Sequence, residues 1–129
     1  MPLNSVITGT GSYIPTVVKT NADFINERFY CEKNEPFDAT NEVIIEKFKA
    51  ITGIEERRYA SDNLNSSDIA AIAAQRAIAD ANIDPETLDY IIFAQNFGDI
   101  KKNTIQTDII PSLAARVKQI LKIENPHCV

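Results

Sequence analysis

Apolar residues recur at the spacing of a helix most regularly over residues 67–81. Ser66 or Ser67 can cap the start of such a helix, and Asn82 suits the left-handed turn that ends one. The alanines on one side follow at intervals of four, three and four residues: Ala70, Ala74, Ala77 and Ala81. We therefore predict a helix with a smooth alanine stripe that permits close backbone approach, and with isoleucines on its other sides that also need cover.

Weaker helical patterns lie on both sides of this segment. Residues 41–52 carry apolar positions at helical spacing and are followed by Gly53, so we predict a helix that ends there. A last helix is predicted over about residues 107–121, where Pro111 is tolerated because it falls in the first turn. Two shorter helices are expected, one beginning near residue 22 and one of a single turn over residues 84–86.

Residues 90–94 form a continuous apolar run, which is typical of a parallel strand covered on both faces. Further short strands are expected at residues 6–8, 57–60 and 128–129. Gly9 and Gly11 follow the first of these, and we expect them in a turn that needs positive φ. A dinucleotide-binding motif is the alternative, but Ile14 stands where its third glycine is required. Alternating strands and helices predict the α/β class, with an incomplete sheet.

Composition narrows the function classes. The 129 residues suit one compact domain, and the net charge of −5 argues against nucleic-acid binding, which depends on basic residues that neutralise phosphates. No apolar run approaches the roughly 20 residues of a membrane-spanning helix, so we expect no membrane partner. Two widely separated cysteines favour a reducing compartment, and we expect a cytoplasmic protein.

Candidate nucleophiles and metal ligands are few. A catalytic cysteine needs a base beside it, but His127 and Cys128 are neighbours whose side chains would point to opposite faces of a strand. We therefore expect Cys128 to be a buried core thiol and Cys31 to lie in a loop or at a helix end. With one histidine in the chain we expect no metal site and no cofactor. From these residues alone no active site emerges.

An ordered set of short motifs changes this picture. It consists of residues 9–15, Val18, and residues 20–23, 52–58, 66–68, 84–85, 89–94 and 111–112. Together these resemble the N-terminal part of 3-oxoacyl-(acyl-carrier-protein) synthase III, also called beta-ketoacyl-(acyl-carrier-protein) synthase III. The resemblance implies a partial thiolase-like α/β fold, namely the N-terminal portion of the first α/β half. We expect residues 1–129 to form one incomplete domain of this kind.

The resemblance also implies an activity. Enzymes of this family condense an acyl thioester primer with malonyl-acyl carrier protein, in fatty-acid or polyketide-type biosynthesis. A cysteine holds the acyl group, and a histidine and an asparagine assist decarboxylation. In the family that cysteine follows the strand that begins at the position of Cys128, so we expect the 129-residue chain alone to be inactive. The alternative is a non-catalytic truncated homologue that dimerises or binds a partner.

The resemblance assigns two residues to the substrate channel and questions one donor. Asn96 matches a position near the channel, and Ile110 matches one that approaches the acyl tunnel of the partner subunit. Structural alternatives are a loop cap for Asn96 and dimer core for Ile110. Lys47 and Ile51 stand where the family has the tryptophan and arginine that grip coenzyme A. We therefore expect acyl carrier protein as a partner and only weak binding of coenzyme A esters.

Assembly is the last expectation. A central strand with few companions and a helix that is apolar on several sides would leave apolar surface exposed in a monomer. We expect a homodimer or higher oligomer whose contacts involve Ile109, Ile110 and the alanine stripe.

Overall fold

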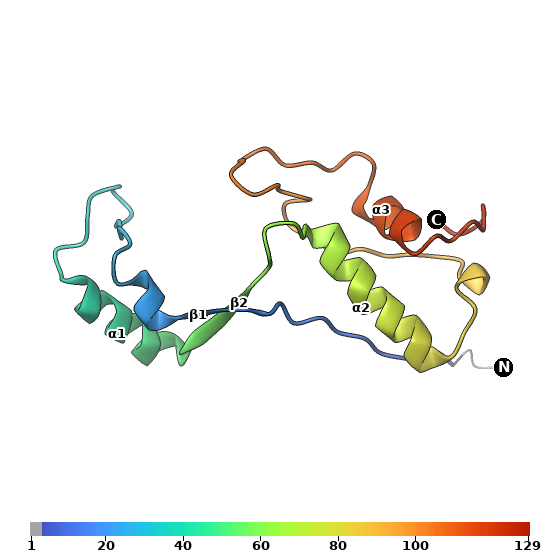
Figure 1. Cartoon of the computed structure of the whole chain (residues 1–129), viewed down its shortest axis with the longest axis horizontal. Coiled ribbons are helices and arrows are strands. Elements are labelled where there is room, and N and C mark those ends of the chain that lie inside the picture. The colour runs from blue at the N-terminus through green and yellow to red at the C-terminus, as the bar shows by residue number, and fades with distance from the viewer. Residues whose placement is uncertain (1–3) are drawn as a thin grey trace. The chain divides into compact units, whose positions relative to one another are not determined.

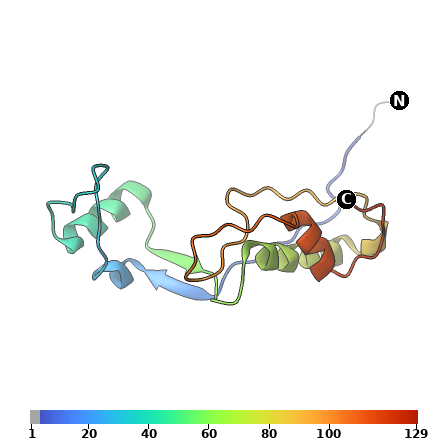
Figure 2. The ribbon, with the colours of Figure 1, turned by 90° about the horizontal axis from the view of Figure 1, so that it is seen from above.

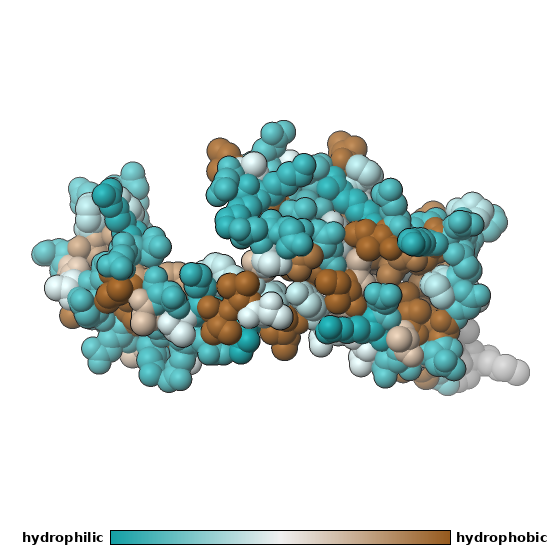
Figure 3. All heavy atoms as spheres, in the orientation of Figure 1, coloured by the Kyte–Doolittle hydropathy of each residue, from teal (hydrophilic) through white to brown (hydrophobic). Residues whose placement is uncertain are grey.

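The computed structural model describes residues 4–129, which divide into two compact units. The small unit is Pro15–Tyr59, and the large unit consists of residues up to Ile14 together with Ala60–Val129. Figure 1 shows the elements of each. Apolar side chains reach the surface of both units, as the brown atoms of Figure 3 show.

The small unit is built on a pair of antiparallel strands. Strand β1 (Val17–Thr20) pairs with β2 (Glu56–Tyr59), in a register that sets Val17 opposite Tyr59. The predicted strand at 57–60 is confirmed one residue earlier, whereas no strand was predicted at β1. The helix predicted near residue 22 is a single 3₁₀ turn, η1 (Asn21–Phe24). The Asp23 carboxylate accepts from the Thr20 N–H at its start, but the residues after Phe24 form a turn and do not continue the helix.

Helix α1 (Asn41–Thr52) confirms the prediction for this segment. It ends at Gly53, whose φ of 67° belongs to the left-handed region that glycine adopts without strain. The cap residue is Thr40, and the Asn41 side chain instead donates to the carbonyl oxygens of Ile25 and Glu27, at 2.7 and 2.9 Å. These bonds tie the start of α1 to the segment that follows η1.

Helix α2 (Ser66–Ala81) is the longest element of the large unit and has the predicted bounds. Its N-cap is Asn65, so the predicted cap at Ser66 or Ser67 is wrong by one or two positions. The Asn65 backbone N–H donates to Asp68 Oδ2 at 2.8 Å, and the helix ends at Asn82, with φ 50°, as predicted. The predicted single turn is confirmed as η2 (Pro85–Thr87). Local capping therefore sufficed to place both helices.

Helix α3 (Leu113–Ile120) begins later than predicted. Its cap is Ser112, whose Oγ accepts from the Ala115 N–H at 3.2 Å, so the chain before Pro111 lies outside the helix. Helices α2 and α3 lie side by side (Figures 1 and 2). Three of their apolar residues are buried: Ala71, Leu113 and Val117.

Gly9 and Gly11 have a different role from the predicted one. Neither has positive φ among the glycines described, and an added Cβ at Gly9 would lie 2.5 Å from Ala81 N. A Cβ at Gly11 would collide with the carbonyl oxygen of Ala73 and with Ala77 N. The glycines are thus required by close approach to the alanine stripe, which confirms the predicted use of that stripe. Residues 6–8 form no strand and are exposed.

The apolar run at residues 90–94 is extended but does not form the predicted strand. Ile91 N–H donates to Val129 O at 2.8 Å, and Val129 N–H donates to Asp89 O at 3.0 Å. These two bonds are one rung of a parallel ladder, so the predicted parallel pairing with residues 128–129 is present at a single position. Within residues 4–129 no further partner extends it, and Ile92 is 93% exposed rather than covered on both faces. No helix among the described residues is long and apolar enough to cross a membrane.

Candidate functional site

Both predicted site residues lie in the loop region between the extended run at 90–94 and helix α3. The backbones of Asp99 and Asp108 pair in an antiparallel bridge, with N–H to oxygen distances of 3.0 and 2.8 Å. The bridge closes residues 99–108 into a loop. The base of the loop consists of Asp99 and Asp108 with the two side chains that bind them, Ser67 and Arg116.

Asp99 ties this loop to the start of α2. Asp99 as a whole is 3% exposed, and its carboxylate accepts from Ser67 N–H at 2.9 Å and from Ser67 Oγ at 2.6 Å. Ser67 is itself buried and lies in the first turn of α2. The N-terminus of a helix favours negative charge and offers free N–H groups, so the position suits a buried carboxylate.

Arg116 of α3 completes the base of the loop. Nη1 donates to Asp99 Oδ2 at 3.0 Å, and Nη2 donates to Asp108 Oδ1 at 2.7 Å. The same side chain binds two carbonyl oxygens, with Nη2 to Ile110 and Nε to Pro111 both at 3.0 Å. The hydrogen bond from Arg116 holds the pKa of Asp108 below its usual range, and the reciprocal bond raises the pKa of Arg116. One planar guanidinium thus fixes four acceptors on the chain that leads into α3.

Ile110 has its backbone carbonyl held by Arg116, but its side chain packs against little. Its side chain is 82% exposed, compared with 55% for Ile109. Ile109 lies against Gly98, where an added Cβ would be 2.6 Å from Ile109 Cγ2 and where φ is 76°. The position of Ile110 is therefore set by its backbone, which is held by Arg116.

Asn96 lies on a separate open groove between α2 and the segment before the loop. The groove has a volume of about 530 Å³ and is mostly apolar; its walls include Ile69, Ala70, Ala73, Phe93 and Phe97. Ile110 is not among the residues that line it. The structure therefore places the two predicted channel residues at different points of the loop region, and their roles stay a prediction.

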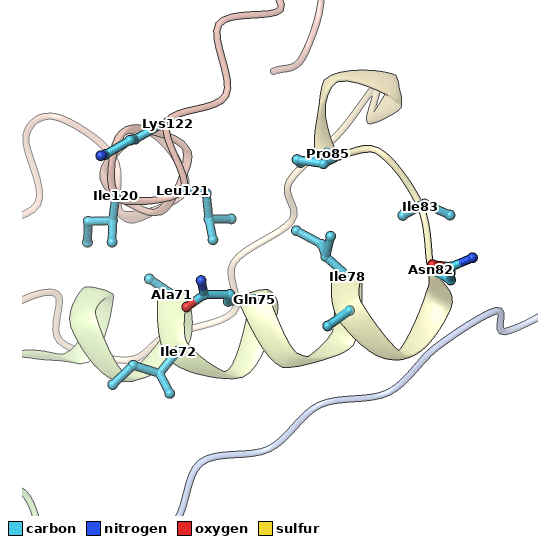
Figure 4. Close-up of a pocket in the computed structure, with 11 residues that line it drawn as sticks. Ala71, Ile72, Gln75, Ile78, Asn82, Ile83, Pro85, Ile120, Leu121 and Lys122 are labelled. Carbon is cyan, nitrogen blue, oxygen red and sulfur yellow. The ribbon is translucent and has the colours of Figure 1, made fainter.

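A second groove has α2 on one side and the end of α3 together with η2 on the other (Figure 4). It measures about 510 Å³, and most of its walls are apolar, with Ile78 and Leu121 pointing toward it. Gln75 and Asn82 supply its polar groups, and Lys122 lies on the side of α3. Among the described residues, no carboxylate, thiol or imidazole lines this groove.

The cysteines are where the sequence placed them. Cys128 is a buried thiol, as predicted, while the neighbouring His127 is exposed. Lys118 Nζ donates to Cys128 O at 2.7 Å, so this lysine binds the backbone of Cys128. Cys31 is half-buried in a loop of the small unit, where its N–H donates to Glu35 O at 2.8 Å. Residues 4–129 contain no cluster of three or more potential metal ligands.

The small unit holds an aromatic pocket of about 200 Å³. It is lined by Asn21, Phe24, Phe29, Ile45, Phe48, Arg57 and Tyr59. The Arg57 guanidinium lies 5.5 Å from the Phe24 ring centroid, a cation–π distance, and Arg57 Nη1 donates to Asn21 Oδ1 at 3.1 Å. Neither Lys47 nor Ile51 lines this pocket, and both are exposed.

Sequence reasoning missed the base of the loop, Asp99, Asp108, Arg116 and Ser67. One signal was available for Arg116, since it lies three residues after Leu113 and four before Ile120, on the apolar side of α3. An arginine at such a position is rarely buried unless a carboxylate pairs with it. The sequence held no comparable signal to show which carboxylates would pair with Arg116.

Comparison with known proteins gives a consistent result. No family model matches the chain. A curated beta-ketoacyl-(acyl-carrier-protein) synthase III from Clostridium acetobutylicum is 39% identical over 127 residues, which is 98% of this chain and 32% of that protein. The chain thus spans about a third of the length of the curated relatives that it matches.

Solved structures agree with this similarity. The synthase III FabH from Pseudomonas aeruginosa matches with a TM-score of 0.65 and 27% identity, over 95% of this chain and 30% of that one. OleA from Xanthomonas campestris matches with a TM-score of 0.63 and 26% identity, over 95% of this chain and 32% of that one. The fold is therefore a partial thiolase-like α/β fold, as the sequence predicted.

Proposed function

Since this chain belongs to the beta-ketoacyl-(acyl-carrier-protein) synthase III family, we propose that the protein carrying it is a condensing acyltransferase. It joins an acyl thioester to malonyl-acyl carrier protein with loss of carbon dioxide, in fatty-acid or polyketide-type synthesis. The observation that carries this proposal is the 39% identity that extends over 98% of the chain. We also propose that the two units are parts of one incomplete thiolase-like domain, in a cytoplasmic protein.

The direct test is condensation by the full-length gene product that contains these residues. Acyl-acyl carrier protein and radiolabelled malonyl-acyl carrier protein are supplied, and formation of the 3-oxoacyl product is measured. A labelled product longer than the primer supports the proposal. The second candidate, a homologue without catalysis that binds a partner, rests on the exposed isoleucines of the large unit. A folded protein that binds acyl carrier protein but forms no product would favour that candidate.

The 129-residue chain by itself is proposed to be inactive. Its thiol at Cys128 is buried, and its exposed neighbour His127 does not contact it through any hydrogen bond within the described residues. A nucleophilic cysteine needs a general base within hydrogen-bond reach of its thiol to become reactive. Incubation of the chain with radiolabelled acyl-coenzyme A is expected to leave it unlabelled. Stoichiometric label at Cys31 or Cys128 would contradict this proposal.

Acyl carrier protein is the proposed acyl donor in preference to coenzyme A. Lys47 and Ile51 are exposed and offer neither a stacking ring nor a phosphate-binding guanidinium. Loss of one stacking contact costs on the order of 1–3 kcal/mol of binding free energy. The full-length protein is expected to have higher kcat/KM with acyl-acyl carrier protein than with acyl-coenzyme A. The double variant Lys47→Trp, Ile51→Arg should reduce that preference, and an initial preference for acyl-coenzyme A would contradict it.

A homodimer is the proposed assembly. Ile109 and Ile110 are exposed on the large unit, and surface of this kind is commonly covered in assemblies. In the alanine stripe, Ala77 and Ala81 already contact Gly9 and Gly11 of the same chain. We therefore propose that the contact between subunits is made by the two isoleucines. Light scattering of the full-length protein at micromolar concentration tests this. A stable monomer would overturn it.

A further inference from the structure

The aromatic pocket of the small unit contains groups to which the proposed condensing activity assigns no role. It measures about 200 Å³, and its walls come from η1, α1, β2 and the segment after η1. Lys47 and Ile51, the positions at which a weak coenzyme A contact is expected, do not line it. The pocket therefore needs an explanation of its own.

Aromatic rings form most of its walls. They are Phe24, Phe29, Phe48 and Tyr59. Phe29 and Phe48 meet edge to face, with ring centroids 5.8 Å apart and planes at 70°. Aromatic side chains favour a further ring placed edge-on or offset against them. Because an apolar cavity of roughly 150 Å³ accommodates benzene, this pocket has room for one aromatic ring with a small substituent.

Arg57 supplies the one charge among the residues that line this pocket. Its guanidinium lies 5.5 Å from the Phe24 ring centroid, and Nη1 donates to Asn21 Oδ1 at 3.1 Å. The Asn21 amide is itself fixed, because its Nδ2 donates to Ile54 O at 2.8 Å. Within residues 4–129, Nε and Nη2 of Arg57 bind no acceptor. A guanidinium held at one nitrogen and free at the others is suited to bind a carboxylate.

The carboxylates closest to Arg57 in the sequence do not neutralise it. Glu55 pairs with Lys49 at 2.7 Å, and Glu56 pairs with Arg58 at 2.9 Å. Successive side chains of a strand point to opposite faces, so Glu56 and Arg58 lie on the face of β2 opposite to Arg57. The half-buried guanidinium therefore presents a positive charge that an anion in the pocket would pair with.

We propose that this pocket binds a monocyclic aromatic carboxylate, with its ring among the aromatic walls and its carboxylate on Arg57. The walls supply apolar contact for the ring, and the guanidinium selects the acid over a neutral compound of the same shape. All the groups that this binding uses belong to the small unit. The inference is thus independent of the proposed condensing activity and goes beyond it.

The test is a titration of the full-length protein with benzoate, followed by NMR of isoleucine methyl groups. Ile45 lines the pocket, and its methyl signal, assigned with the variant Ile45→Val, should shift until the site is saturated. Ile51 lies on the same helix but is 80% exposed and outside the pocket, so its signal should stay in place. A benzoate titration that leaves the Ile45 signal unshifted would overturn the proposal.

A neutral ligand and a pair of variants isolate the charge. Benzyl alcohol has the same ring without the charge and should bind the wild type about tenfold more weakly than benzoate does, the effect of one charge-assisted hydrogen bond. Arg57→Met should weaken benzoate binding by a similar factor and abolish this preference. The matched control is Arg58→Met, the next residue of β2, whose exposed side chain pairs with Glu56 and should leave benzoate binding unchanged. Equal benzoate affinities in the two variants would contradict the role of Arg57.

The wild type decides the question if Arg57→Met fails to fold. Equal affinities for benzoate and benzyl alcohol would show that no positive charge acts on the ligand, and the proposal would be wrong. Benzoate that shifts other methyl signals but not that of Ile45 binds elsewhere, and this result would also overturn it. Because every readout is binding at the small unit, a protein that condenses no acyl thioester leaves the inference standing.

Discussion

The ion pairs of the two units have similar lengths but different surroundings. In the small unit Lys49 and Glu55 meet at 2.7 Å, with side chains 54% and 71% exposed. In the large unit Arg116 and Asp99 meet at 3.0 Å, with side chains 18% and 4% exposed. Water screens the first pair and competes for its hydrogen bonds, whereas the second replaces water for a buried carboxylate. The distance between the charged atoms therefore does not show which pair contributes more to the stability of its unit.

The largest effect is expected from Asp99→Ala. The change leaves the buried N–H and hydroxyl of Ser67 without an acceptor, and unsatisfied buried donors cost about 1–3 kcal/mol of unfolding free energy. Urea unfolding of the full-length protein measures the loss. The control is Asp62→Ala, which removes an exposed partner of Lys102 in the same unit and should have little effect. Equal losses in both variants would erase the contrast between buried and exposed pairs.

The next largest effect is expected where uncharged backbone segments pack closely together. A methyl group at Gly11 would meet the carbonyl oxygen of Ala73, and overpacking of this kind costs about 1–3 kcal/mol. Gly11→Ala is therefore expected to weaken contact between the N-terminal segment and α2, seen as faster amide exchange in residues 9–14. Gly53→Ala is the control in the small unit, where nothing lies near the added methyl group. Its effect comes from the φ of 67° alone and should be about 1–2 kcal/mol.

A smaller effect should appear on acidification. The Arg116 hydrogen bond lowers the pKa of Asp108 below its ordinary value of 3.8. A carboxylate with a lowered pKa in the folded state contributes stability above its unfolded value, and this contribution is lost as pH falls through the folded value. The urea midpoint of the wild type should therefore fall at acid pH more than that of Asp108→Asn. Parallel pH profiles of the two proteins would contradict this role of Asp108.

The smallest effect is expected in the small unit. Lys49→Met removes the partner of Glu55, and the hydrogen bond between them lowers the pKa of that exposed carboxylate. Because both side chains are solvated, the urea midpoint at neutral pH should stay within experimental error of the wild type. A loss as large as that of Asp99→Ala would show that exposure is a poor guide to the importance of these pairs.

Elements whose hydrogen bonds are internal were predictable from the sequence. Helices α1 and α2 lie within one residue of their predicted bounds because local residues mark their ends. Gly53 ends α1 and Asn82 ends α2, each in the left-handed conformation. The alanine stripe likewise predicted a close neighbour, although not that Gly9 and Gly11 would supply it. The family and its partial α/β fold were also recognised from ordered motifs.

Elements that depend on distant partners were decided by tertiary structure. The apolar run at residues 90–94 has the composition of a strand, but a strand requires neighbours, and it has one rung with Val129. Strand β1 formed where no strand was predicted, because β2, far along the chain, pairs with it. The start of α3 moved to Leu113 because Ser112 caps the helix there, while Arg116 binds the carbonyl oxygens of Ile110 and Pro111 ahead of it. The pairing of Asp99 with Arg116 and Ser67 has the same cause, since no local pattern specifies which charges meet across a fold.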